Sequence, residues 1–262
     1  MVMHAAVLGS PISHSLSPIL HRAAYVALGL DWTYEAIEMT TEQLPDFLAS
    51  RDHTWRGLSL TMPLKESVQP LLSEIDSMAL LTGSVNTVYR DDGGWRGANT
   101  DVFGIERSLR EAGLAAVSSA RILGAGATAR SALVAMAELG VSSVVICARR
   151  IEQASALADL AVTVGLVPRI ADLTPEPVTE DLLVSVLPGD AAAPWAQVTV
   201  PNHAVLLDAS YHPWPSALAS TWPGTAVASG KDMLLWQATA QVTLMTGRPA
   251  PVEAMRAALA LN

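Results

Sequence analysis

The chain has 262 residues, enough for two domains of ordinary size. Half of its residues are hydrophobic and 16% are charged, so it can bury a substantial core and is not a disordered protein. It carries 16 Lys and Arg against 25 Asp and Glu, a net charge of −9, and its densest basic cluster is the pair Arg149-Arg150. This charge balance opposes binding to nucleic acids, so we expect no nucleic-acid partner.

The single cysteine, Cys147, excludes an intramolecular disulfide and a cysteine-based zinc site. It ends the hydrophobic run Val144–Cys147, which predicts a buried strand, so we expect it to be a core residue. The first residues, Met1-Val2-Met3-His4, lack the basic and apolar regions of a signal peptide. The longest hydrophobic stretch, residues 122–148, is interrupted by charges and glycines. We therefore expect a soluble, cytoplasmic protein with no membrane association.

In the first hundred residues, short hydrophobic runs alternate with longer amphipathic segments. The runs predict strands at Ala5–Leu8, Tyr34–Ile37, Gly57–Leu60 and Asn86–Tyr89. The segments predict helices at Pro18–Leu28, Gln43–Arg51 and Glu74–Leu81. This alternation predicts an α/β fold, with a mostly parallel sheet and helices on its faces.

A serine-rich segment, Gly9–Pro18, follows the first predicted strand. Ser17 could cap the helix that Pro18 begins. Three serines within one turn are more than a helix cap needs. Their hydroxyls would suit a polyol or a carboxylate ligand.

A second alternating series starts near residue 120. It predicts strands at Arg121–Leu123, Ser143–Cys147, Leu182–Val186, Ala204–Asp208 and Ala226–Ala228, and helices at Ala127–Leu139, Ile151–Leu160, Asp232–Thr246 and Val252–Leu261. The two series meet in a predicted helix near Asp101–Gly113. Two domains joined in this way would leave a cleft between them, a common place for a ligand.

The clearest motif of the chain is G-x-G-x-x-A, directly after a predicted strand and at the start of a helix. It predicts a dinucleotide-binding turn formed by Gly124, Ala125, Gly126, Ala127, Thr128 and Ala129. Gly124 would allow the tight turn, Gly126 would let the backbone approach a pyrophosphate, and Ala129 would let the helix pack closely. Such turns also occur for packing reasons alone, but the order strand, turn, helix, strand favours the dinucleotide.

The end of the next strand indicates which dinucleotide binds. NAD sites usually have an Asp or Glu there, whereas a 2′-phosphate needs cations. This chain has Arg149 and Arg150 and no carboxylate, which favours NADP. The other interpretation is two solvated arginines at a helix start. The six histidines show no H-E-x-x-H pattern, and we expect no metal site.

Five motifs in order identify a family resemblance. They are G-x-P-I-x-H-S-x-S-P at residues 9–18, T-x-P-x-K at 61–65, G-x-V-N-T at 83–87, N-T-D at 99–101 and G-x-x-M-L-x-x-Q at 230–237. With the nucleotide turn between the fourth and the fifth, the chain resembles the NADP-dependent shikimate dehydrogenases over essentially its whole length. The resemblance implies reversible NADPH-dependent reduction of 3-dehydroshikimate to shikimate, a step of aromatic amino acid biosynthesis.

The resemblance also implies a domain organisation and site residues. Residues 1–102 would form the substrate domain, 103–235 a doubly wound Rossmann domain that binds NADP, and 236–262 helices that pack on the first domain. Lys65 and Asp101 would be the catalytic pair, with Lys65 as the general acid and base. The implied substrate-binding residues are Ser15, Ser17, Thr61, Asn86, Asp101, Tyr211 and Gln237, and Gly230 would lie at the cofactor.

Four residues depart from the commoner family pattern: Ser59, Arg22, Ala148 and Lys231. Alternatives therefore remain open. One is a preference for quinate, for NAD or for both; another is a sensor of NADP(H) or of a metabolite that does no chemistry. A folate-type dehydrogenase would share the glycine turn but would leave the serine-rich segment unexplained. The sequence does not separate a monomer from a homodimer.

Overall fold

The structure is a computed structural model that describes residues 1–223 and 226–261; Asn262, the last residue of the expected C-terminal segment, lies outside them. The chain divides into two compact units. The first unit is Met1–Thr100 with Leu234–Asn262, and the second is Asp101–Met233. One boundary between the units falls inside a continuous helix, α9 (Gly230–Thr246).

The first unit contains a six-stranded mixed sheet in the order β2-β1-β3-β5-β6-β4. Its strands are β1 (Met3–Gly9), β2 (Trp32–Glu38), β3 (Trp55–Leu60), β4 (Glu74–Ile75), β5 (Thr87–Asp91) and β6 (Gly94–Ala98). The strand β5 runs antiparallel to β3 and to β6, while the other neighbours are parallel. The sheet is therefore mostly parallel, as expected, and β5 departs from this direction because it forms a hairpin with β6.

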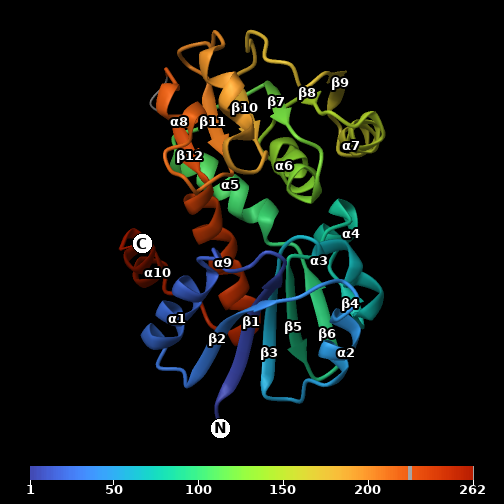
Figure 1. Cartoon of the computed structure of the whole chain (residues 1–262), viewed down its shortest axis with the longest axis vertical. Helices are drawn as coiled ribbons and strands as arrows, with labels where there is room; N and C mark the ends of the chain where they lie inside the picture. Colours follow the sequence, from blue (N-terminus) through green and yellow to red (C-terminus); the bar gives the residue numbers. More distant parts are fainter. Residues whose placement is uncertain (224–225, 262) are drawn as a thin grey trace. The chain divides into compact units, whose positions relative to one another are not determined.

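Helices cover both faces of this sheet (Figure 1). Along β1 the side chains alternate, as a strand requires. Ala5 and Val7 face one apolar cluster, built with α1 (Ser17–Ala27), α9 and α10 (Val252–Ala260). Ala6 and Leu8 face the other cluster, which includes α2 (Leu44–Ala49) and α4 (Ser77–Thr82). The short helices α3 (Leu64–Ser67) and η1 (Gln69–Leu71) follow β3.

The predicted helix at Glu74–Leu81 is wrong at its start. Glu74 and Ile75 form β4, and the helix begins only at Ser77. The cause is a helix cap: the Asp76 carboxylate accepts a hydrogen bond from the Ala79 amide at 2.6 Å. Helix capping, the alternative role considered for Ser17, is not observed, because Ser17 is the first helical residue and Leu16 occupies the cap position.

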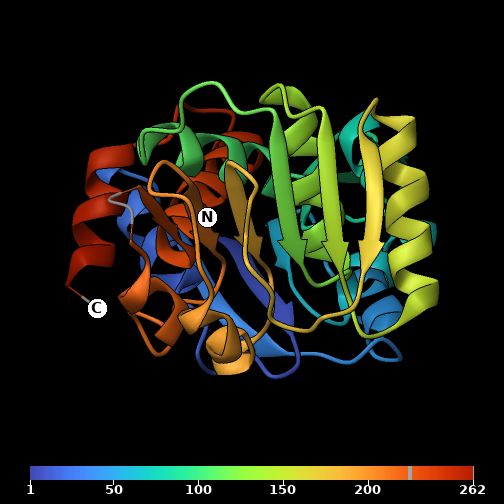
Figure 2. The same ribbon diagram turned by 90° about the horizontal axis from the view of Figure 1, so that it is seen from above.

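The second unit has a six-stranded parallel sheet in the order β12-β11-β10-β7-β8-β9. The strands are β7 (Ser119–Leu123), β8 (Ser143–Cys147), β9 (Val167–Ala171), β10 (Leu182–Ser185), β11 (Val205–Asp208) and β12 (Val227–Ser229). Figure 2 shows β7, β8 and β9 side by side and pointing the same way. The chain starts in the middle of the sheet and winds outward in both directions, which is the doubly wound Rossmann arrangement.

The helices of the second unit fill the two faces of its sheet. The connections α6 (Ala127–Glu138) and α7 (Ile151–Thr163) contact each other, and α5 (Asp101–Glu111) packs on α6. On another apolar cluster, η2 (Gly189–Gln197) and α8 (Ala217–Thr221) place Trp195 and Leu218 against Leu123 and Leu183. Cys147 is buried in this same cluster, as expected.

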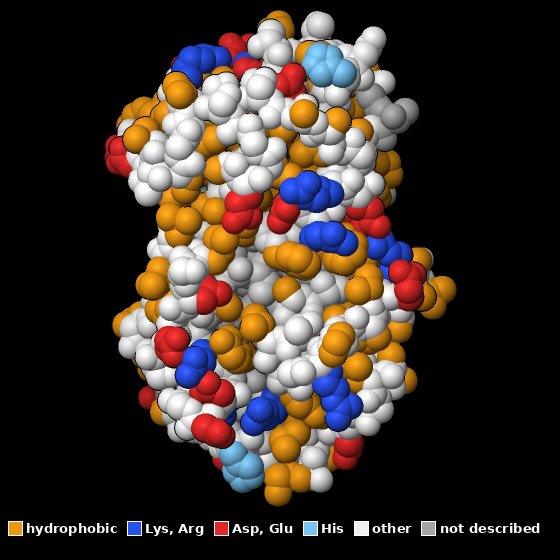
Figure 3. Space-filling view, turned by 180° about the vertical axis from the view of Figure 1, so that it is seen from behind, with side chains coloured by type: hydrophobic (Ala, Val, Ile, Leu, Met, Phe, Trp, Pro, Cys, Tyr) orange, Lys and Arg blue, Asp and Glu red, His pale blue; other side chains and the backbone are white. Residues whose placement is uncertain are grey.

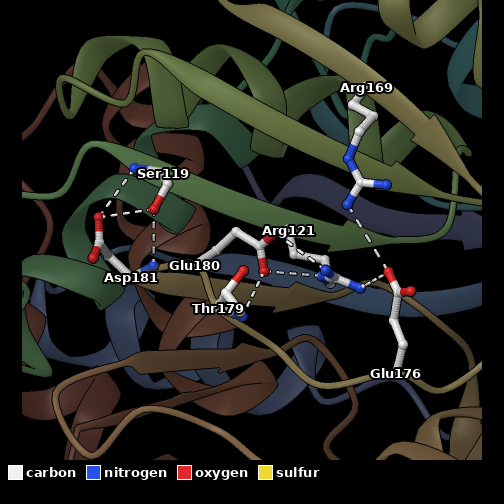
Figure 4. Close-up of polar contacts among 7 residues, drawn as sticks. All are labelled: Ser119, Arg121, Arg169, Glu176, Thr179, Glu180 and Asp181. Carbon is white, nitrogen blue, oxygen red and sulfur yellow. Dashed lines mark hydrogen bonds and ion pairs between the residues drawn. The ribbon is translucent and has the colours of Figure 1, made fainter.

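A buried ion pair ties the long connection between β9 and β10 to the middle of β7 (Figure 4). Arg121 on β7 is 2% exposed, and its Nε and Nη2 donate to the two oxygens of Glu180 at 3.0 and 3.1 Å. Its Nη1 also donates to Glu176 at 2.6 Å. Next to this pair, the Asp181 carboxylate accepts hydrogen bonds from the amides and hydroxyls of Ser118 and Ser119. The buried charges of Arg121 and Glu180 therefore compensate each other.

Candidate functional site

The strand directions of the first unit bring four predicted motifs to one edge of its sheet. β1 and β3 are parallel, and β5 runs the opposite way, so the ends of β1 and β3 meet the start of β5. β6 is antiparallel to β5, so its end lies at this edge too. The serine-rich segment follows β1, Thr61–Lys65 follows β3, Asn86 precedes β5, and Asn99 and Thr100 follow β6.

Backbone hydrogen bonds hold these loops together. The Thr61 amide donates to Leu8 O at 3.0 Å, and the Ser10 amide donates to Met62 O at 3.0 Å. The Val85 amide donates to Lys65 O at 2.8 Å, which links the helix of Lys65 to the segment of Asn86. Lys65 itself is half-buried on α3.

Asn86 is at the centre of a buried polar cluster at this edge. Its Oδ1 accepts hydrogen bonds from the Thr100 amide and the Thr87 hydroxyl, both at 2.8 Å. Its Nδ2 points toward Gln237 Oε1 at 3.4 Å, and Gln237 Nε2 donates to Leu234 O at 2.9 Å. The structure therefore brings Asn86 and Gln237 together, although 151 positions separate them in sequence.

The two predicted serines lie at the start of α1. The Ser17 amide donates to Ser15 Oγ at 3.3 Å, and the Ser17 side chain is 5% exposed. Burial raises the pKa of the Tyr34 phenol, and the Ser59 and Ser17 hydroxyls act in the opposite direction. Asp101 directly follows Thr100 in the chain, is buried, and is the first residue of α5 in the second unit.

Five buried polar residues beneath Asn86 were not predicted from the sequence: His21, Tyr25, Tyr34, Ser59 and Gln241. Burial lowers the pKa of His21 to about 4, so its ring is neutral near pH 7. The ring stacks on Tyr34, with centroids 4.0 Å apart. A signal was available, because His21 follows Ser17 by four residues and Gln241 follows Gln237 by four, which puts each pair on one helix face.

In the second unit, the glycine turn follows β7 and opens α6, as predicted. Gly124 has φ +109°, and a Cβ there would press on Val186, so the turn itself requires glycine. Gly126 precedes the first helical residue, Ala127, and a Cβ there would meet no atom of the described residues within 4 Å beyond its chain neighbours. Packing therefore does not explain Gly126, whereas the approach of a ligand to the backbone would. Ala129 is fully buried, and Ala125 and Thr128 complete the turn.

Arg149 and Arg150 follow β8, next to this turn. The Gly124 amide donates to Cys147 O at 2.9 Å, so only Ala148 separates the arginines from a residue bonded to the turn. Both side chains are exposed. Among residues 1–223 and 226–261, no ion pair or hydrogen bond occupies either guanidinium, so both are available for a phosphate.

Tyr211 and Gly230 follow β11 and β12 at the same edge of the parallel sheet. The Asp208 carboxylate fixes the loop of Tyr211, because it accepts hydrogen bonds from the Ser210 amide and the Ser216 hydroxyl. Tyr211 is half-buried, and burial raises its pKa. A Cβ on Gly230 would collide with the backbone of Ala209 and Ser210. Close backbone packing is therefore a sufficient reason for glycine at 230.

The described part of the chain contains no group of three or more His, Cys, Asp or Glu side chains able to hold a metal ion. In the same residues, no helix is both long and apolar enough to cross a bilayer. On the face drawn in Figure 3, Lys and Arg side chains stand in small groups beside Asp and Glu, so this face carries no continuous basic surface.

Comparisons with known proteins agree with this geometry. Residues 7–88 match the family model of the shikimate dehydrogenase substrate binding domain, and residues 230–260 match that of the shikimate 5'-dehydrogenase C-terminal domain. The chain is 37% identical to a shikimate dehydrogenase (NADP(+)) of Moorella thermoacetica, over 95% of this chain and 90% of that protein.

Solved structures extend the similarity to three dimensions. A shikimate dehydrogenase from Mycobacterium tuberculosis is 44% identical, with a TM-score of 0.89 and coverage of 99% of both chains. A shikimate 5-dehydrogenase from Thermus thermophilus, solved with NADP(H) and shikimate, is 30% identical, with a TM-score of 0.87 and coverage of 99% of both chains.

Proposed function

Because the chain belongs to the shikimate dehydrogenase family, we propose that it catalyses the reversible NADPH-dependent reduction of 3-dehydroshikimate to shikimate. The observation that carries this proposal is the convergence of Ser17, Thr61, Lys65 and Asn86 on one sheet edge, with Gln237 hydrogen-bonded to Asn86. The hydroxyl and amide groups gathered at this edge can hydrogen-bond to a ligand that carries several hydroxyls and a carboxylate.

We assign substrate binding to the first unit. Ser15 and Ser17 would hold the carboxylate, and Thr61, Asn86 and Gln237 would hold the ring hydroxyls. The family resemblance adds Tyr211 to these substrate-binding residues. Two small serines in place of a bulkier residue favour shikimate over quinate, which carries one more hydroxyl at the carboxylate carbon.

Lys65 is the proposed general acid and base. The ketone oxygen becomes an alkoxide during reduction, and the Lys65 ammonium can donate a proton to it and stabilise the developing charge. In the reverse direction the neutral amine accepts that proton. Asp101 is the proposed partner that orients Lys65. Its burial at the start of α5 restricts its rotamers, as an orienting group requires.

We assign cofactor binding to the second unit. NADPH supplies the hydride when it is bound. The turn of Gly124, Ala125, Gly126, Ala127, Thr128 and Ala129 would hold the pyrophosphate at the start of α6, and Arg149 and Arg150 would bind the 2′-phosphate. The open space at Gly126 and the two available guanidiniums both support this assignment, and Gly230 would lie near the cofactor.

We further propose that the enzyme works in the cytoplasm, as a monomer or homodimer, without a nucleic-acid partner. The net charge of −9 supports the last point. Sedimentation of the purified protein would distinguish the two assembly states.

The proposal is tested by steady-state turnover of the purified protein with two acids, shikimate and quinate, each paired with NADP+ and with NAD+. We expect shikimate with NADP+ to give the highest kcat/KM of the four combinations. Faster oxidation of quinate with NAD+ would overturn both preferences. Binding of ligands without any NADPH formation would instead identify a sensor module.

A further inference from the structure

Gln241 lies on α9, one turn after Gln237, and is 1% exposed. Its amide makes four hydrogen bonds within the first unit. Nε2 lies 3.2 Å from the Asn86 carbonyl oxygen and 3.1 Å from Thr87 Oγ1. Oε1 lies 2.7 Å from Ser59 Oγ and 3.2 Å from His21 Nε2. Every hydrogen-bonding position of a primary amide is therefore used.

The orientation of this amide follows from chemistry. The main-chain carbonyl of Asn86 can only accept a hydrogen bond, so the atom that faces it must be the nitrogen of Gln241. The oxygen of the amide then faces Ser59 and His21. Ser59 must donate to it, and His21 must carry its proton on Nε2. A neutral His21 meets this requirement, because its pKa is well below neutrality.

The same reasoning gives the direction of the bonds on both sides of Gln241. Ser59 has one proton and donates it to Gln241, so the Tyr34 phenol must donate to Ser59, over 2.6 Å. On the other side, Thr87 accepts from Gln241 and can give its own proton to Asn86 Oδ1, over 2.8 Å. A single directed chain therefore runs from Tyr34 through Ser59, Gln241 and Thr87 to the side chain of Asn86.

One end of this chain meets a residue assigned to the substrate. There, Gln241 acts on Asn86 twice, on its main-chain oxygen directly and on its side-chain oxygen through Thr87. With Asn86 Oδ1 held by Thr87 and by the Thr100 amide, the nitrogen Nδ2 faces Thr100 Oγ1 at 2.9 Å and Gln237 Oε1 at 3.4 Å.

We propose that Gln241 is a positioning residue for the substrate. By fixing the hydroxyl direction of Thr87, it acts with the Thr100 amide to hold Asn86 Oδ1, so that Asn86 Nδ2 stays turned toward Gln237, the other residue assigned to the ring hydroxyls. It touches neither substrate nor cofactor. This role rests on the proposed function, because it needs Asn86 to be a substrate-binding residue. Misorientation of one such donor is expected to weaken binding and turnover of the substrate without affecting the cofactor.

The test compares steady-state kinetics of Gln241→Met with those of the wild type. Met has a similar volume but offers neither donor nor acceptor for this chain of bonds. We expect the KM for shikimate to rise about 10-fold, and the KM for NADP+ to stay within about 2-fold. The matched control is Val242→Ala, the next residue of α9, fully buried in the apolar cluster. It should lower the melting temperature and leave the KM for shikimate unchanged.

Variants of Thr87 test the same chain of hydrogen bonds independently, even if Gln241→Met does not fold. Thr87→Val removes the hydroxyl and should raise the KM for shikimate. Thr87→Ser keeps the hydroxyl and should have a KM for shikimate close to that of the wild type. The double variant Gln241→Met/Thr87→Val should be no worse than the poorer single variant, because both act on one group.

Two results would overturn the inference while leaving the proposed function intact. One is an active Gln241→Met enzyme with an unchanged KM for shikimate. The other is additive effects of Gln241→Met and Thr87→Val. A wild-type protein that does not oxidise shikimate would instead defeat the proposed function, and this is measured first.

Discussion

Three of the predicted site residues are glycines, and a different physical cause explains glycine at each of these positions. Gly124 needs a positive φ, Gly230 needs space for the backbone of residues 209–210, and Gly126 needs neither. The sequence motifs predicted all three positions. They could not distinguish packing from ligand approach, because that depends on which atoms surround each Cα.

Arg149 and Arg150 carry the cofactor preference in our proposal. We predict that the double variant Arg149→Ala/Arg150→Ala weakens binding of NADP+ by more than about 10-fold, because a guanidinium–phosphate contact contributes roughly 1.5–3 kcal/mol. NAD+ has no 2′-phosphate, so its affinity should change little. Calorimetric titration of both dinucleotides measures the difference.

The control for this double variant is Arg110→Ala. Arg110 is an exposed arginine of the same unit whose Nε is paired with Glu106 at 2.8 Å. The Arg110→Ala variant should bind NADP+ and NAD+ with the affinities of the wild type. An equal loss for NADP+ and NAD+ in the double variant would show that the arginines do not recognise the 2′-phosphate.

At the scale of elements, the buried strands were predictable from the sequence, whereas β4, β6 and β9 were missed. The strands β8, β10 and β11 consist mostly of hydrophobic residues because both faces of a parallel sheet are covered. The edge strand β9, by contrast, contains Pro168 and exposes Val167, so its sequence resembles that of a loop. β6 was missed because two of its five residues are glycines.

The connection into β10 also depends on a contact that sequence patterns do not reveal. Asp181 accepts hydrogen bonds from two amides and two hydroxyls at the start of β7, 62 and 63 positions away. These bonds, led by that from the Ser118 amide, hold the pKa of Asp181 well below its usual value. A lowered folded-state pKa stabilises the fold above the unfolded-state pKa, and this stabilisation is lost as the pH falls.

We therefore predict that Asp181→Asn lowers the unfolding free energy at pH 7 by about 1 kcal/mol. The deficit should shrink as the pH falls below about 4, where the carboxyl of the unfolded chain takes up its proton. Chemical denaturation at several pH values measures it. Asp159→Asn, at an exposed carboxylate on α7, is the control. A deficit that stays constant down to the lowest pH at which the protein folds would contradict this account.

For the whole molecule, the two-sheet α/β organisation was predictable from the alternation of runs and from one glycine motif. The candidate site was predictable only through the family resemblance, because its residues lie in four separate loops and a late helix. Periodicity cannot show that Asn86 and Gln237 meet, since their contact depends on how α9 packs against β1 and β3. The polar residues below them, such as Ser59 and Gln241, look in sequence like isolated polar positions within hydrophobic stretches.

Global stability should depend on one buried histidine. The folded-state pKa of His21 is lowered to about 4 by burial, so the unfolded chain binds a proton that the folded chain rejects between pH 6.5 and 4. Stability should therefore fall as the pH drops through this window, with His21 contributing up to roughly 1.4 kcal/mol per pH unit.

His21→Gln should flatten this dependence, as measured by denaturation at half-unit steps of pH. Burial raises the pKa values of Asp76, Glu138 and Asp208, which opposes the His21 effect but is common to both proteins. If the unfolding free energies of the wild type and the variant depend equally on pH, His21 is already protonated, or solvated, in the folded state.

The role of Lys65 as general acid and base is tested most directly by the turnover of Lys65→Met with shikimate and NADP+, together with the dissociation constant of shikimate. If Lys65 carries the proton in the transition state, kcat falls by a factor on the order of 10³ while the dissociation constant changes less than about 5-fold. A kcat equal to that of the wild type would contradict the account, because no proton transfer could then be assigned to Lys65.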